Sequence, residues 1–214
     1  MVDESVKGRR QYDATGRRER AAASRRAVLA AAHRLLLIDG YAATTVPDVA
    51  AAAGVSAEFV YKNIGRKAAL LGAVLDVALA GDDAPLAMAE RESIAALRAL
   101  TDPAEVLAGY LVVMVGVQVR VAPLLLLAAR SADPDAGALV VKADTERLAG
   151  MTGLARHLHG LGGLRPGLDV DTAVDLLWAY TAPSLYDLLV LRRGWSPSAY
   201  REHVRAALTA ALLG

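Results

Sequence analysis

The stretch AAAGVSAEFVYKNIGRKAAL, residues 51–70, decides how the sequence folds. Small apolar residues lead into Gly54, and a polar run that includes Tyr61 and Lys62 follows. Two short helices joined by a turn of three or four residues with a glycine form a helix-turn-helix. Gly54 permits the sharp turn, and Ser56 is a preferred residue type for capping the helix that follows. The stretch therefore predicts a bihelical unit whose second helix carries a polar outer surface.

The residues before this stretch supply a matching helix start. Thr45 followed by Asp48 fits the capping-box pattern, in which each side chain satisfies a backbone N–H at the start of a helix. Pro47 lies in the first turn, where its missing N–H costs nothing. A preceding helix over about 24–38 is predicted from apolar residues at helical spacing, and Gly40 is suited to end it.

Composition and charge narrow the class of protein. The chain has 214 residues, 55% of them hydrophobic, and no cysteine, which excludes disulfides and cysteine-based zinc sites. Residues 1–67 carry 12 Lys and Arg against 7 Asp and Glu, whereas residues 68–214 carry 12 against 16. A basic N-terminal third on an acidic body is typical of a protein that binds a polyanion, although an ordinary solvated surface remains an alternative.

Nothing in the sequence suggests a membrane or secreted protein. The N-terminus lacks the apolar segment of a secretion signal, and the run VAPLLLLAA, residues 121–129, is shorter than the roughly 20 residues that span a bilayer. We expect a cytoplasmic protein without a membrane partner.

The chain as a whole is predicted to be all-α. Alanine and leucine dominate, strand signals are scarce, and Gly, Pro and Asp punctuate the helical segments. We expect a flexible basic arm over 1–22, a three-helix helix-turn-helix DNA-binding domain over 23–70, and a helical ligand-binding and dimerisation domain over 71–214. Beyond Arg66 the predicted helices are 66–80, 84–100, 103–118, 122–132, 134–160, 169–192 and 197–212.

A helix-turn-helix places its second helix in the major groove of DNA. Tyrosine, lysine and the N–H groups of the helix start then contact phosphates. The stretch from Gly40 to Leu71 resembles the signature of TetR-family transcriptional regulators over about 25–71. The matching residues are Gly40, Tyr41, Thr44, Thr45, Val49, Ala50, Ala53, Gly54, Val55, Ser56, Tyr61, Lys67 and Leu70.

The resemblance and the position of the second helix together give a set of expected DNA-binding residues. They are Thr44, Thr45, Ser56, Ala57, Glu58, Tyr61, Lys62, Asn63 and Lys67. Phe59 stands where the family often has a phosphate-binding threonine, so the usual donor of one backbone contact is absent. Asn63 and Ile64 replace the family's frequent His-Phe pair.

For the body, the resemblance implies an apolar ligand cavity around the middle helices. Tyr110, Met114 and Gln118 recur every fourth residue and share one helix face, and their chemistry suits such a cavity. Trp178 is a further candidate. The alternative for Tyr110, Met114 and Gln118 is plain core, and for Trp178 it is either the dimer seam or the core. The segments 134–160 and 169–192 resemble the family's dimerisation pair, with apolar positions at Val140, Leu148, Leu154, Val174, Leu177, Leu185 and Leu189.

These features predict a ligand-responsive regulator of the repressor class, which leaves operator DNA when a small hydrophobic effector binds. We expect a homodimer on double-stranded operator DNA, with no metal and no cofactor. The alternatives are an all-α enzyme or small-molecule-binding protein with an incidental helix pair, and an architectural DNA-binding protein without an effector. No nucleophile elbow, HExxH motif or suggestive carboxylate pair supports the enzyme alternative.

Overall fold

The computed structural model describes the chain over residues 4–81 and 92–214. Every regular element in these ranges is a helix, so the all-α prediction is confirmed for the part of the chain that is described. The chain forms two compact units, Met1–Val74 and Leu75–Gly214. Each unit has its own buried apolar residues.

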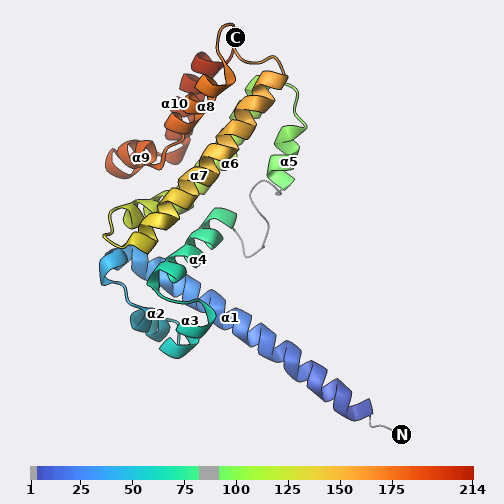
Figure 1. Ribbon diagram of the computed structural model, residues 1–214, viewed down its shortest axis with the longest axis vertical. Helices are drawn as coiled ribbons and strands as arrows, with labels where there is room; N and C mark the ends of the chain where they lie inside the picture. Colours follow the sequence, from blue (N-terminus) through green and yellow to red (C-terminus); the bar gives the residue numbers. More distant parts are fainter. Residues whose placement is uncertain (1–3, 82–91) are drawn as a thin grey trace. The chain divides into compact units, whose positions relative to one another are not determined.

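The first unit consists of α1 (Glu4–Ala43), α2 (Val46–Ala52), α3 (Ala57–Asn63) and the first part of α4 (Lys67–Ala80). In Figure 1, α2 and α3 lie against the C-terminal half of α1. Helical geometry in α1 is interrupted at Gly40, whose φ of 84° confirms the predicted left-handed region at the end of this helix.

The buried face of α1 explains why the three helices assemble. Val28, Ala32 and Leu36 are almost completely buried and recur every fourth residue, so they form one apolar stripe. Val49 on α2 and Val60 on α3 are fully buried as well. These branched side chains form the small core that the sequence predicts between the short helices.

The arm predicted over 1–22 has a helical backbone where the structure describes it, and its flexibility stays a prediction. Residues 4–22 belong to α1, and the side chains of residues 17–23 are exposed to solvent. The segment AAASRRAVLAAA, residues 21–32, is rich in the strongest helix formers. Because adding residues to an existing helix is easier than nucleating one, the packed helix extends into the basic segment.

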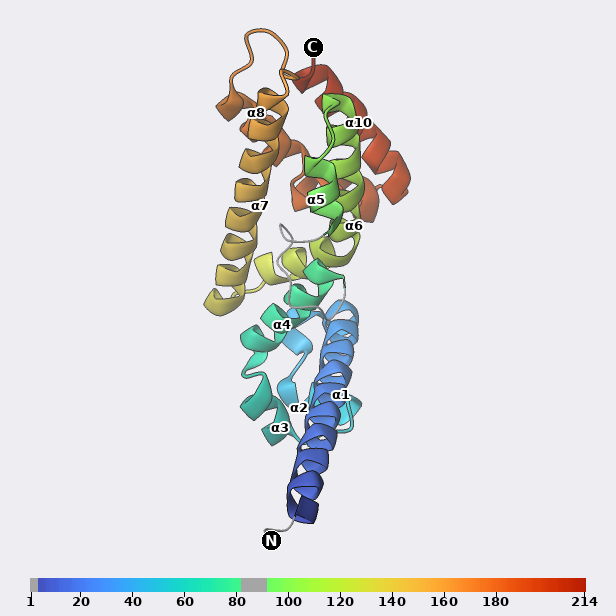
Figure 2. The same ribbon diagram turned by 90° about the vertical axis from the view of Figure 1, so that its right-hand side faces the viewer.

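The second unit is a helical body built around one long helix. After the end of α4 come α5 (Glu92–Arg98), α6 (Pro103–Ala129), α7 (Pro134–Gly160), α8 (Val170–Tyr180), α9 (Pro183–Tyr186), the π-helical segment η2 (Asp187–Arg192) and α10 (Pro197–Leu212). Helix α6 packs against α5, α7, α9 and α10, and α8 packs against α7 and α10 (Figure 2).

The predicted helices 134–160 and 197–212 are confirmed, but two other predictions in the body were wrong. The expected helices 103–118 and 122–132 are one helix, α6, which contains Pro123. Its packing on four neighbours compensates for the hydrogen bond that Pro123 cannot make. The expected helix 169–192 is interrupted at residues 181–182, because Pro183 favours the extended conformation that Ala182 adopts. The predicted helix 84–100 lies partly outside the described residues.

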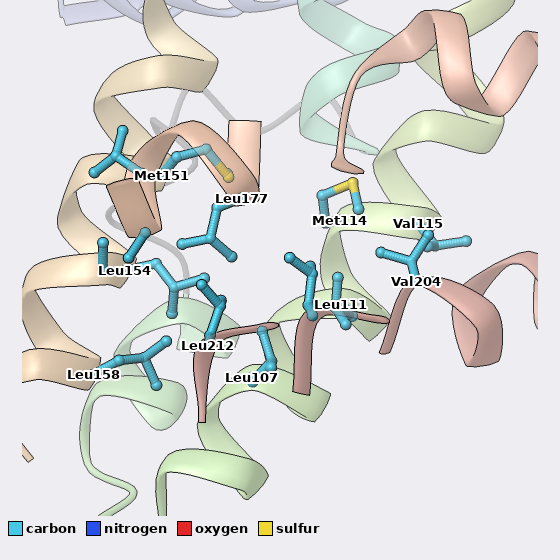
Figure 3. Close-up of a cluster of buried hydrophobic side chains, with 14 of the residues drawn as sticks. Leu107, Leu111, Met114, Val115, Met151, Leu154, Leu158, Leu177, Val204 and Leu212 are labelled. Carbon is cyan, nitrogen blue, oxygen red and sulfur yellow. The ribbon is translucent and has the colours of Figure 1, made fainter. Parts of the chain in front are cut away.

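The core of the body gathers side chains from α6, α7, α8 and α10 (Figure 3). The residues labelled there are Leu107, Leu111, Met114, Val115, Met151, Leu154, Leu158, Leu177, Val204 and Leu212. Among the described helices, α6 alone is long and apolar enough to cross a membrane. Eleven of its residues are buried within the body, which accounts for its apolar composition.

Candidate nucleic-acid interface

The α2–turn–α3 segment is fixed by local hydrogen bonds that the sequence encodes. The Thr45 hydroxyl caps α2 by accepting a hydrogen bond from the Asp48 backbone N–H at 3.3 Å, and it also donates to the Asp48 carboxylate. Gly54 in the turn has a φ of 68°. The Ser56 hydroxyl caps α3 by accepting from the Phe59 N–H at 3.1 Å. Both predicted caps are therefore present, and they fix where each short helix starts.

Helix α3 has a buried side and an exposed side. Val60 is fully buried, whereas Glu58, Lys62 and Asn63 are exposed and Tyr61 retains 49% of its accessible surface. A large aromatic side chain that is half exposed beside a lysine is well suited to contact a partner. The polar outer surface predicted for the second helix is therefore present.

The other predicted DNA-binding residues divide by accessibility. Thr45 and Ser56 are exposed, and Ala57 is half-buried. Thr44 is only 2% exposed, and its hydroxyl donates to the Gly40 carbonyl at 2.8 Å. The Thr44 side chain therefore closes the end of α1, and a contact of this residue with DNA stays a prediction.

Lys67 is half-buried and connects α4 to the end of α1. Its Nζ donates to the Ala42 carbonyl at 3.0 Å and lies 4.5 Å from the centre of the Tyr41 ring. Carbonyl and aromatic partners both stabilise the ammonium group at this position. Lys67 therefore has a structural role. Its ammonium group is only partly buried, so its charge remains near the surface of the unit.

Two features of this surface were not predicted from the sequence. Arg25 on α1 donates to the Asn63 carbonyl at 3.2 Å, which joins α1 to the end of α3. A hollow of about 320 Å³ also lies beside α3, lined by Thr44, Thr45, Val46, Pro47, Tyr61, Arg66 and Lys67. Both depend on tertiary contacts, for which a single sequence carries no signal.

The residues that depart from the family pattern also have defined positions. Phe59 is half-buried, and the Asn63 side-chain amide donates to the Phe59 carbonyl at 2.7 Å. Asn63 therefore satisfies the backbone within its own helix, and part of its donor capacity is already used.

The body contains a buried polar cluster, which we define as Gln118, Arg147, Thr181 and Tyr200. The Gln118 side-chain N–H donates to the Thr181 carbonyl at 2.8 Å, and Arg147 donates to the Thr181 hydroxyl at 3.2 Å. Gln118 Oε1 and Arg147 Nε are buried and have no hydrogen-bond partner within residues 4–81 and 92–214. Unpartnered buried polar atoms are costly, so this cluster carries unused hydrogen-bonding capacity.

Tyr200 in the cluster and Tyr110 beside it are both desolvated. Burial raises the pKa of Tyr110 to about 12, and the nearby Arg147 partly opposes that rise. Burial likewise raises the pKa of Tyr200 to about 12, with a hydrogen bond to Gln118 acting in the opposite direction. Both phenols are therefore neutral at physiological pH and act as hydrogen-bonding groups.

The predicted ligand-binding residues lie around this cluster. Met114 belongs to the buried core, Gln118 is 5% exposed, and Tyr110 is half-buried. Trp178 is 36% exposed, and the Arg147 guanidinium lies 4.8 Å from the centre of its ring system. Arg147, Thr181 and Tyr200 were not predicted, because they come from three other segments of the chain.

The first unit thus has the architecture of a helix-turn-helix DNA-binding domain. Helices α1, α2 and α3 pack together, α2 and α3 each begin with a side-chain cap, and the outer face of α3 is polar and exposed. Residues 28–74 match the family model for bacterial regulatory proteins of the tetR family. The first unit is therefore similar to the N-terminal DNA-binding domain of TetR-family regulators. Comparison with curated protein sequences gives no match.

Solved structures share the fold over nearly the whole chain. NalD, the secondary repressor of the MexAB-OprM multidrug efflux pump in Pseudomonas aeruginosa, is 20% identical with a TM-score of 0.68, covering 91% of this chain and 98% of its own. FadR from Bacillus subtilis, solved with stearoyl-CoA, is 17% identical with a TM-score of 0.67, covering 86% and 97%. TylP, a TetR regulator from Streptomyces fradiae, is 23% identical with a TM-score of 0.62, covering 91% and 89%.

Proposed function

We propose that this protein is a ligand-responsive transcriptional repressor that binds operator DNA as a homodimer and releases it when a small hydrophobic effector enters the helical body. The observation that carries the proposal is the capped helix α3 with Glu58, Tyr61 and Lys62 on its open face. NalD is a repressor, which supports the direction of regulation, and FadR was solved with an acyl-CoA, which supports an apolar effector.

On DNA, the exposed residues of α3 divide by role. Glu58 and Lys62, together with the half-buried Ala57, face the base edges, whereas Tyr61 contacts a phosphate through its hydroxyl group. Thr45 and Ser56 present their exposed helix starts to the backbone. Asn63 contributes its remaining N–H, and Lys67 contributes charge rather than a direct contact.

The effector site of this proposal is the polar cluster with Tyr110, Met114 and Trp178. Gln118 Oε1 accepts a hydrogen bond from the effector, and Arg147 Nε donates one, because neither atom has a partner among the described residues. The surrounding leucine and methionine side chains contact the apolar remainder of the ligand.

Helix α6 gives the effector site a physical connection to α4. Gln118 reaches the cluster, and Arg120, two residues further on, donates to the Ala78 carbonyl at the end of α4 at 2.7 Å. The other end of α4 is held by Lys67 on the Ala42 carbonyl. A displacement of α6 by the effector therefore acts on the helix that continues into the DNA-binding unit. Such coupling requires that effector and operator weaken each other's binding equally.

The homodimer of this proposal uses an exposed apolar surface of the body. Leu154, Val174 and Leu177 are buried within one protomer, so they do not form the seam that the sequence suggested. Val141 and Leu148 on α7, seven residues apart, are 67% and 41% exposed, and Leu188 and Leu191 in η2 are about half exposed. Exposed apolar residues of this size mark interaction surfaces. A two-fold dimer then presents two α3 helices to a pseudo-palindromic operator.

The proposal is tested by selecting bound duplexes from a random DNA library with the full chain. The enriched sequence is then titrated in the presence of apolar metabolites. We expect a pseudo-palindrome, steep salt dependence, and loss of binding with at least one metabolite class. Trp178 fluorescence, in a Trp195→Phe variant, reports effector binding directly. Absence of any enriched sequence would contradict the proposal.

A further inference from the structure

Helix α1 extends well beyond the helices that pack against it. Its C-terminal half carries α2 and α3, whereas the N-terminal half continues past them in both views (Figures 1 and 2). The side chains of residues 17–23 are exposed, so the core of the first unit does not account for this extension.

On the N-terminal extension, the side of α1 that faces the core further along the helix carries arginines instead of apolar residues. At 100° per residue, Val28, Ala32 and Leu36 fall within an arc of about 80°, and Arg17, Arg18 and Arg25 fall within the same arc to within about 20°. Between residues 16 and 27 no acidic residue shares this arc, since Glu19 lies about 100° from its nearer edge. We call Arg17, Arg18 and Arg25 the arginine stripe.

One member of the stripe fixes its direction relative to α3. Arg25 donates to the Asn63 carbonyl, the last residue of α3, at 3.2 Å. The stripe therefore starts at the end of α3 and runs along α1 away from it, on the side of α1 that faces α3. In the proposed docking, with α3 in the major groove, flanking duplex is expected on this side of α1.

We propose that the arginine stripe is a second DNA-binding surface, which holds the phosphate backbone of duplex DNA flanking the bases that α3 reads. This inference rests on the proposed function. Guanidinium groups on one helix face fit regularly spaced phosphates, and each contact releases condensed counterions. The stripe adds affinity for any sequence and lengthens the footprint on each half-site without adding base preference.

The test compares two double variants with equal charge loss. Arg17→Gln with Arg18→Gln removes two of the three stripe arginines and keeps Arg25, which contacts α3. Arg20→Gln with Arg26→Gln removes two exposed cations from the remaining circumference of the helix. Glutamine keeps the helix propensity, and circular dichroism checks that both variants keep their helix content. Each is titrated with the selected operator in a 40-base-pair duplex and in a duplex trimmed to the bases that α3 selects.

On the long duplex we expect the stripe variant to bind about tenfold or more weakly near 0.15 M salt, with a salt slope lower by about 2 per protomer. The control variant is expected to change affinity less than about threefold, and the trimmed duplex is expected to abolish the difference. Arg17→Lys with Arg18→Lys should restore binding.

Equal losses in both variants, or a loss that persists on the trimmed duplex, would overturn the proposal. So would an unchanged DNA affinity combined with lost binding to vesicles containing phosphatidylserine, which would assign the stripe to a membrane surface. Failure to select any operator would instead refute the proposed function, so the two failures are distinguishable.

Discussion

The DNA-binding unit and the helical body of this protein differ in the sequence separation of the interactions that define them. In the first unit, Thr45, Gly54 and Ser56 act within a few residues of themselves, and each performs the local role that its type predicts. In the body, Gln118 meets Thr181 across 63 positions of sequence and Arg147 meets Thr181 across 34. Local interactions can be predicted from a single sequence, whereas long-range interactions can be identified only once the fold is known.

This difference explains which predictions succeeded. The all-α class, the caps, the turn and the exposed face of α3 followed from spacing and residue type. The structural role of Thr44 was missed, because the family signature does not reveal that its hydroxyl closes α1 at Gly40. The break before Pro183 was missed because the apolar pattern continues across it, and Arg147, Thr181 and Tyr200 had no sequence signal as a group.

We expect the most severe loss of function from a substitution that unfolds the first unit and leaves the body folded. Val60→Asp places a carboxylate where the side chain has no solvent exposure, and an unpaired buried charge costs about 3 kcal/mol or more. We expect DNA binding to disappear while the body keeps its thermal transition, as measured by calorimetry. Glu58→Ala, on the exposed side of α3, is the control and should keep the first unit folded. Simultaneous loss of both units would show that they are not independent.

Tyr61→Ala removes the contact surface of α3 without touching the core. The side chain is 49% exposed, so we expect less than about 1 kcal/mol loss of stability but a DNA affinity reduced about tenfold, equal to about 1.4 kcal/mol. Fluorescence anisotropy with labelled operator measures this. Tyr61→Phe separates the hydroxyl from the ring, and unchanged affinity in both variants would count against the docking of α3.

Alkaline pH is expected to lower the stability of the body through its two buried tyrosines. Burial raises the pKa of Tyr110 and Tyr200 from the ordinary tyrosine value of 10.0 to about 12, so the protonated phenols stabilise the folded body below pH 10. That contribution is lost as pH rises from about 10 to about 12, because the unfolded chain releases these protons first. We expect the free energy of unfolding of the body to fall across this pH range, as measured by chemical denaturation at each pH. Tyr200→Phe should flatten the decline, and an unchanged pH profile would contradict the role of burial.

Leu148→Arg tests the exposed seam of the body. The side chain is 41% exposed in one protomer, so the substitution should cost each protomer less than about 1 kcal/mol. We expect light scattering to show a shift from dimer to monomer, with weaker binding to a two-half-site operator and little change for one half-site. A dimer of unchanged stability would place the seam elsewhere.

The smallest expected effect lies in the turn of the first unit. Gly54 has a φ of 68°, and an alanine there meets no atom within 4 Å, so Gly54→Ala tests backbone strain alone. We expect a loss of about 1 kcal/mol in the stability of the DNA-binding unit, measured by denaturant titration. A gain in stability would mean that the turn relaxes to another conformation.

Site-specific photocrosslinking shows whether the outer face of α3 meets base edges. The chain has no cysteine, so Lys62→Cys provides a unique attachment point for a photoreactive group, and Ala30→Cys on an exposed position of α1 provides the control. We predict efficient crosslinks from position 62 to bases at the centre of each operator half-site, with few from position 30. Equal yields from both positions, or crosslinks from position 62 that show no preferred base, would contradict the account.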